Sequence, residues 1–373
     1  MHCDATNETN VLPPAGARVL VAMSGGVDSV AAAALLTRAG YVCMGATLRM
    51  TGEPPTKSVF EPCCGIQAVE DARRVCDRLN IEHRTVRIVE EFDRHIIAHF
   101  AAQYAAGLTP NPCIRCNRMI KFGLLYAYAK TWGFDYIAMG HYARLSIRGG
   151  RMALRRSTHR PKDQSYVLAP LTQPQLRRAC FPLGEMSKDA ARAVAAEVDP
   201  ATGAKAESQE ICFVADRNYA RIVEARHGPA TPGNIVDIDG NVLGRHKGIY
   251  HYTIGQRRGL GISAPQPLYV IAMDTVTNTL VVGRDEQSLC ASFTTGPVFR
   301  GALAPDATVF RALVQLRYRH TPVPGTVTIT KDGAEIELET PQRAVTPGQW
   351  AVFYDPEDYV LAAATIRSFV LPK

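Results

Sequence analysis

The hexapeptide Ser24-Gly25-Gly26-Val27-Asp28-Ser29 has the composition of an anion-binding turn. Adjacent glycines let the backbone pass close to a ligand and adopt positive φ. The N–H groups at the start of a following helix attract phosphate. The hexapeptide lacks the lysine of the GxxxxGK[ST] phosphate loop, so we expect it to cradle a pyrophosphate and not to polarise a γ-phosphate. The alternative is a capped turn between a strand and a helix that binds no ligand.

A second group of candidate reactive residues is the pair Cys113-x-x-Cys116, with Cys212 almost a hundred residues further along the chain. Two prolines before the pair favour an extended approach. We expect a helix to begin near Arg118, with Asn117 as its cap. Cys116 would then lie close to a helix N-terminus, where the dipole lowers the pKa of a thiol and favours the thiolate. Polar neighbours of Cys212 indicate an accessible loop.

The residues alone leave three interpretations of these thiols open. Structural zinc needs four ligands, usually from two close pairs, and the chain has a single C-x-x-C. A pair of buried, inert cysteines is the second interpretation. The third is sulfur chemistry, either as a persulfide or as ligands of an iron–sulfur cluster. The spacing favours the third, because C-x-x-C suits redox or metal chemistry.

The elements that would position these residues alternate along the first half of the chain. Short apolar runs predict strands at 18–23, 42–48, 84–89 and 136–140. Helical patterns predict helices at 27–38, 64–79, 92–106, 121–132 and 183–197. Strands that alternate with helices indicate a parallel α/β sheet covered on both faces. The hexapeptide would connect the first strand to the first helix.

The second half of the chain differs from the first in composition and in its predicted secondary structure. Residues 228–263 are rich in glycine and proline, and Asp239-Gly240 is typical of a hairpin turn. From residue 268 onward, short strand-like runs alternate with turn residues, which indicates a small barrel or sandwich. We therefore predict three domains, namely an α/β domain at 16–225, a small central β-rich domain at 226–295 and a C-terminal β-barrel at 296–373.

The composition excludes several classes of protein. Apolar residues make up 46% of the 373, which rules out a disordered chain. The 42 Lys+Arg and 35 Asp+Glu give a formal charge of +7, which fits an anionic partner. No apolar run approaches the roughly 20 residues that cross a bilayer, and the first residues lack the features of a secretory signal. We expect a cytoplasmic protein with no membrane partner, whose ten cysteines are mostly reduced and buried.

The hexapeptide resembles the signature of the PP-loop ATP pyrophosphatase superfamily, whose members cleave ATP between the α- and β-phosphates and adenylate a substrate. Six further motifs follow it in the order typical of MnmA-type tRNA 2-thiouridylases: TPNPCIRCN (109–117), MGHYAR (139–144), KDQSY (162–166), FPLG (181–184), ESQEICF (207–213) and TIGQRRGLG (253–261). The resemblance runs nearly end to end. It implies a PP-loop domain, a small central domain and a C-terminal β-barrel that binds tRNA.

The resemblance also implies a reaction and a set of site residues. ATP with Mg²⁺ would adenylate the C2 oxygen of the wobble uridine, position 34, in tRNA for Lys, Glu and Gln, and sulfur would then replace that oxygen. Cys116 would be the nucleophile and Cys212 the persulfide carrier, and the two could afterwards close as a disulfide; an upstream sulfur relay or cysteine desulfurase would supply the sulfur. The implied ATP-binding residues are Ala22, Met23, Ser24, Gly25, Gly26, Val27, Asp28, Ser29, Leu48 and Gly140. The implied contacts to the target base are Asn111, Pro112 and Cys113, and those to the rest of the tRNA are His141, Lys162, Asp163, Gln164, Arg317, Tyr318 and Gln349.

A second mechanism stays open beside the persulfide. Some members of the family have Asp where this chain has Cys113, so a thiol there is not needed for persulfide chemistry. With Cys113 present, the three thiols of residues 113, 116 and 212 could hold three irons of a [4Fe–4S] cluster and leave the fourth iron open to sulfide.

Two basic segments and two rival functions complete the expectations, together with a third function that the sequence disfavours. The segments 143–164 and 245–259 would follow tRNA phosphates, or they are simply solvated loops. The rival functions are a PP-loop synthetase that adenylates a small molecule and a non-catalytic RNA-binding protein. A thiolase for tRNA position 32 is disfavoured because the paired C-x-x-C arrangement of that family is missing.

Overall fold

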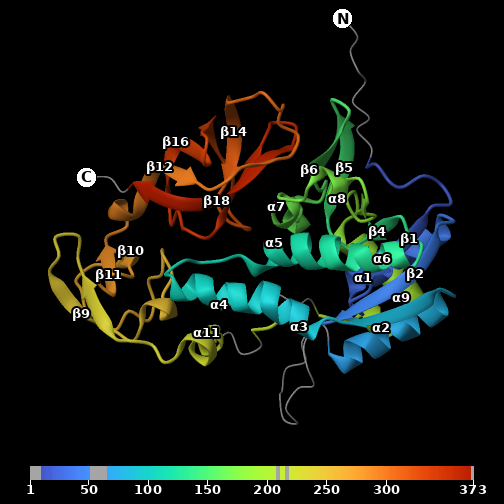
Figure 1. The fold of residues 1–373 in the computed structure, drawn as a ribbon, viewed down its shortest axis with the longest axis horizontal. Coiled ribbons are helices and arrows are strands. Elements are labelled where there is room, and N and C mark those ends of the chain that lie inside the picture. The colour runs from blue at the N-terminus through green and yellow to red at the C-terminus, as the bar shows by residue number, and fades with distance from the viewer. Residues whose placement is uncertain (1–9, 51–64, 207–210, 215–217, 371–373) are drawn as a thin grey trace, which may run out of the picture.

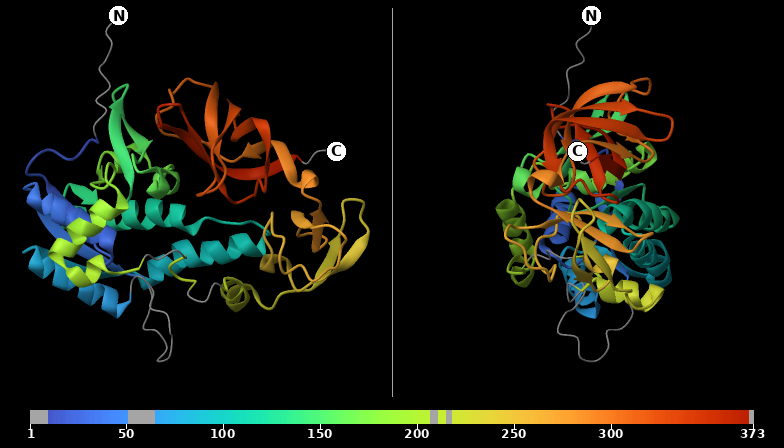
Figure 2. Two further views of the ribbon diagram at one scale, coloured as in Figure 1. Left: turned by 180° about the vertical axis from the view of Figure 1, so that it is seen from behind. Right: turned by 90° about the vertical axis from the view of Figure 1, so that its left-hand side faces the viewer.

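The computed structural model describes residues 10–50, 65–206, 211–214 and 218–370. Three larger sheets follow one another along the chain, and the first lies at the opposite end of the molecule from the second (Figures 1 and 2). Cys64, with which the second predicted helix begins, and residues 207–210 of the ESQEICF motif lie outside the described residues. Within the described part, none of the helices is long and apolar enough to cross a membrane.

The first sheet confirms the predicted α/β architecture. Its strand order is β3-β2-β1-β4-β7, and each neighbouring pair is parallel. The strands are β1 (Arg18–Ala22), β2 (Val42–Arg49), β3 (Glu82–Arg87), β4 (Tyr136–Ala138) and β7 (Ala179–Cys180). Because successive side chains of a strand point to opposite faces, Leu20 enters one buried cluster while Val19 and Val21 enter another. Helices therefore cover both faces, as the apolar strands require.

Two groups of helices make these two layers. The face of Val19 packs against α1 (Val27–Arg38), α2 (Ile66–Arg78) and α9 (Lys188–Val198). The face of Leu20 packs against α3 (Val89–Phe92), the π-helix η1 (Asp93–Ile97) and a long helix made of α5 (Pro112–Cys116), the π-helix η2 (Asn117–Leu125) and α6 (Tyr126–Thr131). The long helix begins at Pro112, whereas the sequence predicted a start near Arg118. The remaining helices are α4 (Ala98–Ala105), α7 (Ser165–Leu168), α8 (Gln173–Leu176), α10 (Pro200–Gly203) and α11 (Ala220–His227), with single 3₁₀ turns at η3 (Arg160–Lys162), η4 (Ile249–His251) and η5 (Glu286–Ser288).

The central sheet and the barrel also agree with the predicted fold class. The central sheet has the order β10-β11-β8-β9, and β8 and β9 form the predicted hairpin, with Gly240 at φ 87°. The six barrel strands are closed by the pairing of β12 with β18, and the short β13 (Phe299–Arg300) pairs beside β18. The central strands are β8 (Gly233–Val236), β9 (Val242–His246), β10 (Tyr269–Asp274) and β11 (Thr279–Gly283). The barrel strands are β12 (Leu289–Thr295), β14 (Val309–Gln315), β15 (Val323–Ile329), β16 (Ala334–Arg343), β17 (Trp350–Tyr354) and β18 (Val360–Val370). The division at residue 296 stays a prediction; β12, which precedes it, pairs with barrel strands.

The arginine-rich segment 143–164 holds the barrel against the first domain. It forms the hairpin of β5 (Ala143–Arg148) and β6 (Arg151–Arg156), which lies next to the barrel (Figure 2). The Arg156 guanidinium donates to Gln315 Oε1 (3.1 Å), and the guanidinium of Arg148 pairs with Asp355. Arg148 and Arg155 also lie over the ring of Tyr359, each 4.5 Å from its centre. These arginines therefore serve an interdomain contact, and the expectation that the segment follows tRNA phosphates stays a prediction.

Candidate active site

A cavity of about 210 Å³ opens at the carboxyl ends of β1, β2 and β4. The strand order reverses between β1 and β4, and ligands of open α/β sheets bind outside the strand ends at such a switch point. The lining includes polar and apolar side chains of the three strand ends and of the long helix: Ala22, Met23, Ser24, Asp28, Ser29, Ala46, Thr47, Leu48, Met50, Lys121, Met139, Gly140, His141 and Gln164.

The hexapeptide has the geometry of a phosphate-binding turn. Gly25 has φ +69°, and a Cβ there would lie 2.8 Å from the carbonyl oxygen of Ala68, so only glycine fits. Gly26 is the N-cap of α1, and no side chain caps that helix. The Ser29 hydroxyl donates to the Gly26 carbonyl (2.9 Å), and Ser24 N–H donates back to Ser29 Oγ (3.3 Å). The turn thus presents a helix N-terminus to the cavity.

Three residues from later parts of the chain, Gly140, Tyr142 and Lys188, hold the start of α1 in place. A Cβ at Gly140 would lie 2.5 Å from the carbonyl carbon of Asp28, so the turn after β4 packs directly on the helix. The Asp28 carboxylate accepts hydrogen bonds from the Tyr142 hydroxyl (2.7 Å) and the Lys188 ammonium (2.6 Å). The structure therefore brings together the residues implied for ATP: seven line the cavity, and Gly25, Gly26 and Val27 build the turn beside it.

The C-x-x-C pair lies in the first helical turns of α5. Asn111 caps this helix by accepting a hydrogen bond from Ile114 N–H (3.3 Å), and Pro112 occupies the first helical position. Cys113 is exposed and lies in the first turn, next to the positive end of the helix, while Cys116 follows in the fifth position and is 8% exposed. The predicted cap at Asn117 is therefore wrong. Proline is well suited to the first position of a helix, and Asn111 supplies the cap one residue before it.

Cys212 lies in a turn, half-buried, as expected for a loop residue. Val214 N–H donates to the Ile211 carbonyl (2.9 Å) and closes the turn. The neighbouring Phe213 inserts its ring between Phe92 and Phe100, with edge-on contacts at 5.8 Å and 5.2 Å between ring centres. Cys212 packs against the same hydrophobic cluster that contains Cys116. Cys116 belongs to this cluster and Cys212 packs against it, so both cysteines border one hydrophobic core.

Several residues implied for tRNA binding lie around Tyr318, which the barrel contributes. The pKa of the Tyr318 hydroxyl is raised to about 12, first by burial and then by the nearby negative charges of Asp163 and Cys113, against the lowering effects of Arg319 and of a hydrogen bond with Gln164. The ring of Tyr318 lies 6.2 Å from that of Tyr166. These contacts join the barrel to the KDQSY and TPNPCIRCN motifs.

Other residues of this set have structural partners or lie elsewhere. Gln349 donates to the carbonyl of Thr109 (2.9 Å), so it fixes the approach to α5. Arg317 donates to the carbonyl of Arg343 (3.3 Å), within the barrel. The Asp163 carboxylate accepts hydrogen bonds from Ser157 N–H (2.9 Å) and the Ser165 hydroxyl (2.8 Å), which hold the KDQSY segment in shape.

His141 lies in the wall of the nucleotide cavity and not at the barrel. Its ring packs against Phe122 and Phe181, and its Nδ1 has no hydrogen-bond partner. Burial, helped by the positive charge of Lys121, lowers the pKa of His141 well below its usual range, so the imidazole is neutral. A buried, unpartnered nitrogen beside an open cavity is a group that a ligand can satisfy.

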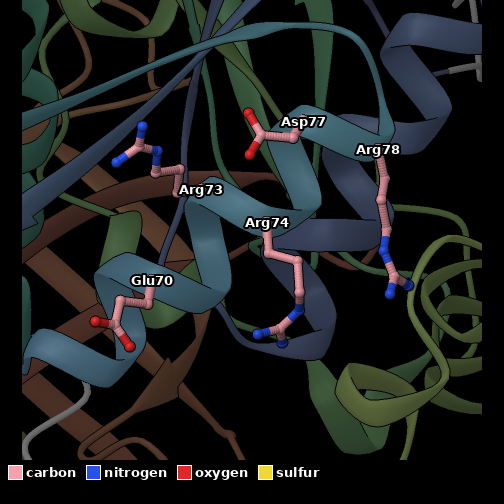
Figure 3. Close-up of a pocket in the computed structure, with 5 residues that line it drawn as sticks. All are labelled: Glu70, Arg73, Arg74, Asp77 and Arg78. Atoms are coloured by element: carbon pink, nitrogen blue, oxygen red, sulfur yellow. The ribbon is translucent and has the colours of Figure 1, made fainter.

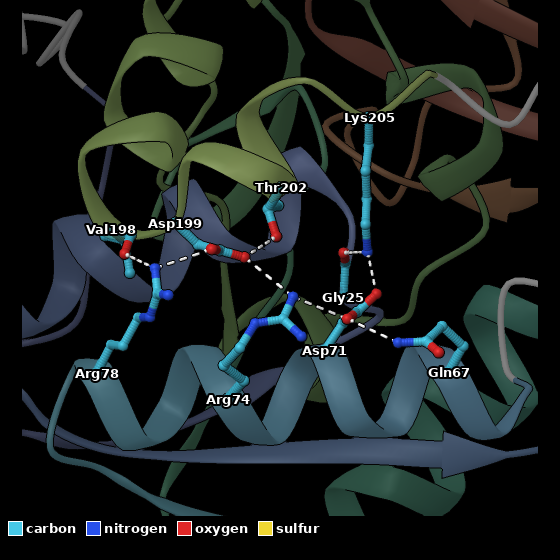
Figure 4. A network of polar contacts seen from close by, with 9 residues as sticks. All are labelled: Gly25, Gln67, Asp71, Arg74, Arg78, Val198, Asp199, Thr202 and Lys205. Atoms are coloured by element: carbon cyan, nitrogen blue, oxygen red, sulfur yellow. Dashed lines mark hydrogen bonds and ion pairs between the residues drawn. The ribbon is translucent and has the colours of Figure 1, made fainter.

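A surface hollow on α2 is unrelated to this cavity. It is lined by charged side chains that point outward from one face of the helix (Figure 3): Glu70, Arg73, Arg74, Asp77 and Arg78. Arg74 and Arg78 pair with the buried Asp199 at 3.1 Å and 2.8 Å, and they tie α2 to the end of α9 (Figure 4). Burial opposes ionisation of Asp199, but hydrogen bonds from Thr202 and Arg74 outweigh it and lower the pKa of that carboxyl.

The same network reaches the hexapeptide. The Lys205 ammonium donates to the Gly25 carbonyl (2.8 Å) and pairs with Asp71 on α2 (Figure 4). Lys205 stands seven residues before Cys212, so the segment with that cysteine starts from a residue anchored on the phosphate-binding turn. Sequence reasoning missed Lys121, Lys188 and Lys205, because a lysine without a motif gives no signal of its own.

The thiols of Cys113, Cys116 and Cys212 do not form a ready metal centre. Over residues 10–50, 65–206, 211–214 and 218–370, no three His, Cys, Asp or Glu side chains are grouped so that they could hold a metal ion. Cys113 is exposed while Cys116 faces the core. The arrangement therefore does not fit a three-cysteine cluster.

A parallel sheet with a glycine-rich turn at its switch point defines an ATP-binding protein of the PP-loop class. Three family models match successive parts of the chain: "tRNA methyl transferase HUP domain" (17–216), "tRNA methyl transferase PRC-barrel domain" (223–284) and "Aminomethyltransferase beta-barrel domain" (297–366). The tRNA-specific 2-thiouridylase MnmA of Lachnoclostridium phytofermentans is 42% identical over 94% of this chain and 99% of its own length. Those of Carboxydothermus hydrogenoformans and Chloroflexus aurantiacus are 44% and 45% identical, over 94% and 91% of this chain and 97% and 95% of their own lengths. The chain belongs to the family of tRNA-specific 2-thiouridylases.

Proposed function

We propose that this protein converts uridine 34 of tRNA for Lys, Glu and Gln to 2-thiouridine at the expense of ATP. The observation that carries the proposal is the shared hydrophobic cluster of the two cysteines and the nucleotide cavity. Leu48, Met50 and Met139 line the cavity and belong to the same cluster as Cys116, against which Cys212 packs. Adenylation and sulfur transfer would thus take place on adjoining surfaces.

The first step is adenylation of the target base. The C2 oxygen of uridine attacks the α-phosphorus of ATP, the bond to the β-phosphate breaks, and pyrophosphate leaves with the bonding electrons. The N3 proton of the base passes to water. The hexapeptide turn and the N-terminus of α1 favour the negative pyrophosphate. The carbonyl oxygen, a poor leaving group, has become part of AMP.

The second step is sulfur transfer from Cys212. The outer sulfur of a Cys212 persulfide attacks C2, the C2–O bond breaks, and AMP leaves. The Cys116 thiolate then attacks the Cys212 sulfur, which releases the thiolated base and leaves a Cys116–Cys212 disulfide. A thiol reductant must reduce that disulfide before the next cycle. The outer sulfur itself comes from a sulfur-donating protein that carries a persulfide.

The persulfide route is favoured over the iron–sulfur route by the chain's own donor set. The described residues do not group the three thiols, as a cluster with one open iron would require. Mg²⁺ fits better, because this ion is commonly held by one or two carboxylates together with phosphates and water. Asp28 lines the cavity, and its carboxylate would serve as the protein ligand, while the ion would neutralise phosphate charge.

The family models are named after methyl transfer, whereas the relatives are named 2-thiouridylases. The residues of the site favour the activity in the relatives' names. A PP-loop cavity and two cysteines that border one hydrophobic cluster support ATP-driven sulfur transfer, whereas methyl transfer has no use for either. The residues around Tyr318 support tRNA as the substrate, because splayed bases of RNA are recognised by aromatic stacking and hydrogen bonds. A synthetase for small molecules would not need a barrel that contacts the cysteine helix.

The test is thiolation of unmodified tRNA with ATP, a persulfide donor and the purified protein, followed by mass analysis of the nucleosides. We expect 2-thiouridine at position 34 with the wild type and none with Cys116→Ser or Cys212→Ser. Cys290→Ser, a buried cysteine of the barrel, is the matched control and should retain activity. AMP formation without any tRNA would support the small-molecule synthetase, and retained thiolation in Cys212→Ser would overturn the persulfide role. Full activity of colourless, iron-free protein would eliminate the cluster.

A further inference from the structure

Lys121 is a cation in the nucleotide cavity that no motif singled out. It lies on η2 and lines the cavity together with Asp28, Ser29 and His141. Among the lining side chains, Lys121 is the one lysine or arginine, and burial lowers the pKa of the other basic residue, His141, well below its usual range. Across the described part of the chain, Lys121 forms no ion pair with a carboxylate. Its side chain therefore brings a positive charge to the cavity wall, and no carboxylate of the described residues pairs with it.

The other two lysines near the hexapeptide are already engaged. Lys188 pairs with Asp28, and Lys205 pairs with Asp71 while it donates to the carbonyl of Gly25. Both stabilise the turn from outside. The hexapeptide has no lysine of its own, so a protein cation that acts on the phosphates beside Mg²⁺ would come from another element. Lys121 is the lysine that η2 provides for this purpose.

The π-helical geometry of η2 affects how far Lys121 is rotated about the helix from Cys116. In an α-helix, five residues turn the chain by about 140° beyond one full turn, because there are 3.6 residues per turn. In a π-helix, residues i and i+5 are joined by a hydrogen bond and lie nearly above one another. Cys116 is the residue before η2, and Lys121 is five residues after it. The wider helix therefore rotates Lys121 less far from Cys116 than an α-helix would.

We propose that Lys121 is a catalytic residue of the adenylation step, an assignment that rests on the proposed function. Its ammonium binds the non-bridging oxygens of the α-phosphate. As the C2 oxygen of the base bonds to phosphorus and the bond to pyrophosphate breaks, negative charge on these oxygens is stabilised by a cation positioned in advance. Lys121 neither gains nor loses a proton in this step.

The experiment compares single-turnover adenylation by wild type, Lys121→Met, Lys121→Arg and Lys121→Ala. The readouts are AMP formation with tRNA at saturating ATP, the dissociation constant of ATP, and the melting temperature. We expect Lys121→Met to lose about 10²- to 10³-fold in the rate of AMP formation, as for other groups that stabilise transition-state charge. ATP binding should weaken far less, and Lys121→Arg should recover part of the rate. Lys130→Met, an exposed lysine on the same long helix, is the control and should match the wild type.

Chemical rescue separates a catalytic from a structural role. Added ethylamine should restore part of the rate of Lys121→Ala, because the free ammonium can occupy the space of the missing side chain. A wild-type adenylation rate in Lys121→Met, or failure of both arginine and amine to restore any rate, would overturn the assignment. Wild-type protein that forms no 2-thiouridine would instead refute the proposed function, so the two failures are distinguishable.

Discussion

The Phe213→Ala substitution tests whether the docked position of Cys212 matters for sulfur transfer. Phe213 makes edge-on contacts with Phe92 and Phe100. Each aromatic pair contributes about 0.5–1.5 kcal/mol beyond the burial of area. Loss of both pairs removes about 1–3 kcal/mol from the docked conformation, which corresponds to a decrease of about 5- to 150-fold in the ratio of docked to undocked Cys212 segments.

The assay measures the two chemical steps separately in a single turnover. AMP release without thiolated product reports adenylation followed by hydrolysis, and 2-thiouridine reports sulfur transfer. We expect Phe213→Ala to adenylate near the wild-type rate while its yield of 2-thiouridine falls about 5- to 150-fold, by the energies above. Phe213→Leu keeps part of the apolar volume, so its yield of 2-thiouridine should lie between those of the wild type and Phe213→Ala.

Phe310→Ala is the matched control for this experiment. Phe310 is half-buried and makes an edge-on contact with Phe353 inside the barrel, at 6.1 Å between ring centres. Its removal should lower the melting temperature without a selective loss of sulfur transfer. The reasoning is refuted if Phe213→Ala thiolates like the wild type, or if both steps fall equally in Phe213→Ala and Phe310→Ala.

Three further predictions follow from the geometry of the nucleotide cavity. Gly140→Ala places a Cβ 2.5 Å from the Asp28 carbonyl carbon; such overpacking costs about 1–3 kcal/mol, so ATP titration should show weaker binding, whereas Gly240→Ala, in the exposed hairpin, should bind ATP normally. Burial lowers the pKa of His141, so below about pH 6.5 the unfolded state takes up a proton that the folded state excludes. Denaturant titrations should therefore show that the free energy of unfolding decreases as the pH is lowered, and that it decreases less steeply in His141→Gln. Lys205→Met removes the link between Gly25 and Asp71; it should weaken ATP binding more than Lys247→Met, and equal affinities would contradict the anchor.

The sequence predicted the first sheet well because its strands are short apolar runs and its turns contain glycine. It placed the start of the cysteine helix wrongly. Asn111 and Asn117 are both good caps, and Pro112 decides between them because proline fits the first helical position. Over nine residues, the sequence pattern of a π-helix cannot be distinguished from that of an α-helix. The position of Lys121 in the cavity wall could therefore not be predicted from the sequence. The arginines of the β5–β6 hairpin were likewise ambiguous, because their acceptors in the barrel lie about two hundred residues away.

The distribution of lysines around the hexapeptide explains why a loop without its own lysine can serve phosphate chemistry. Lys188 and Lys205 act on the protein side of the turn, where each neutralises a carboxylate that would otherwise repel phosphate, namely Asp28 and Asp71. Both therefore shape the turn but add little net charge to the cavity. Lys121 comes from the helix that carries Cys116, so its contribution depends on the placement of that helix and not on the turn. If the turn binds phosphate through its backbone and Lys121 supplies the cation, adenylation depends on the same helix whose Cys116 thiolate must then attack Cys212 and release the thiolated base.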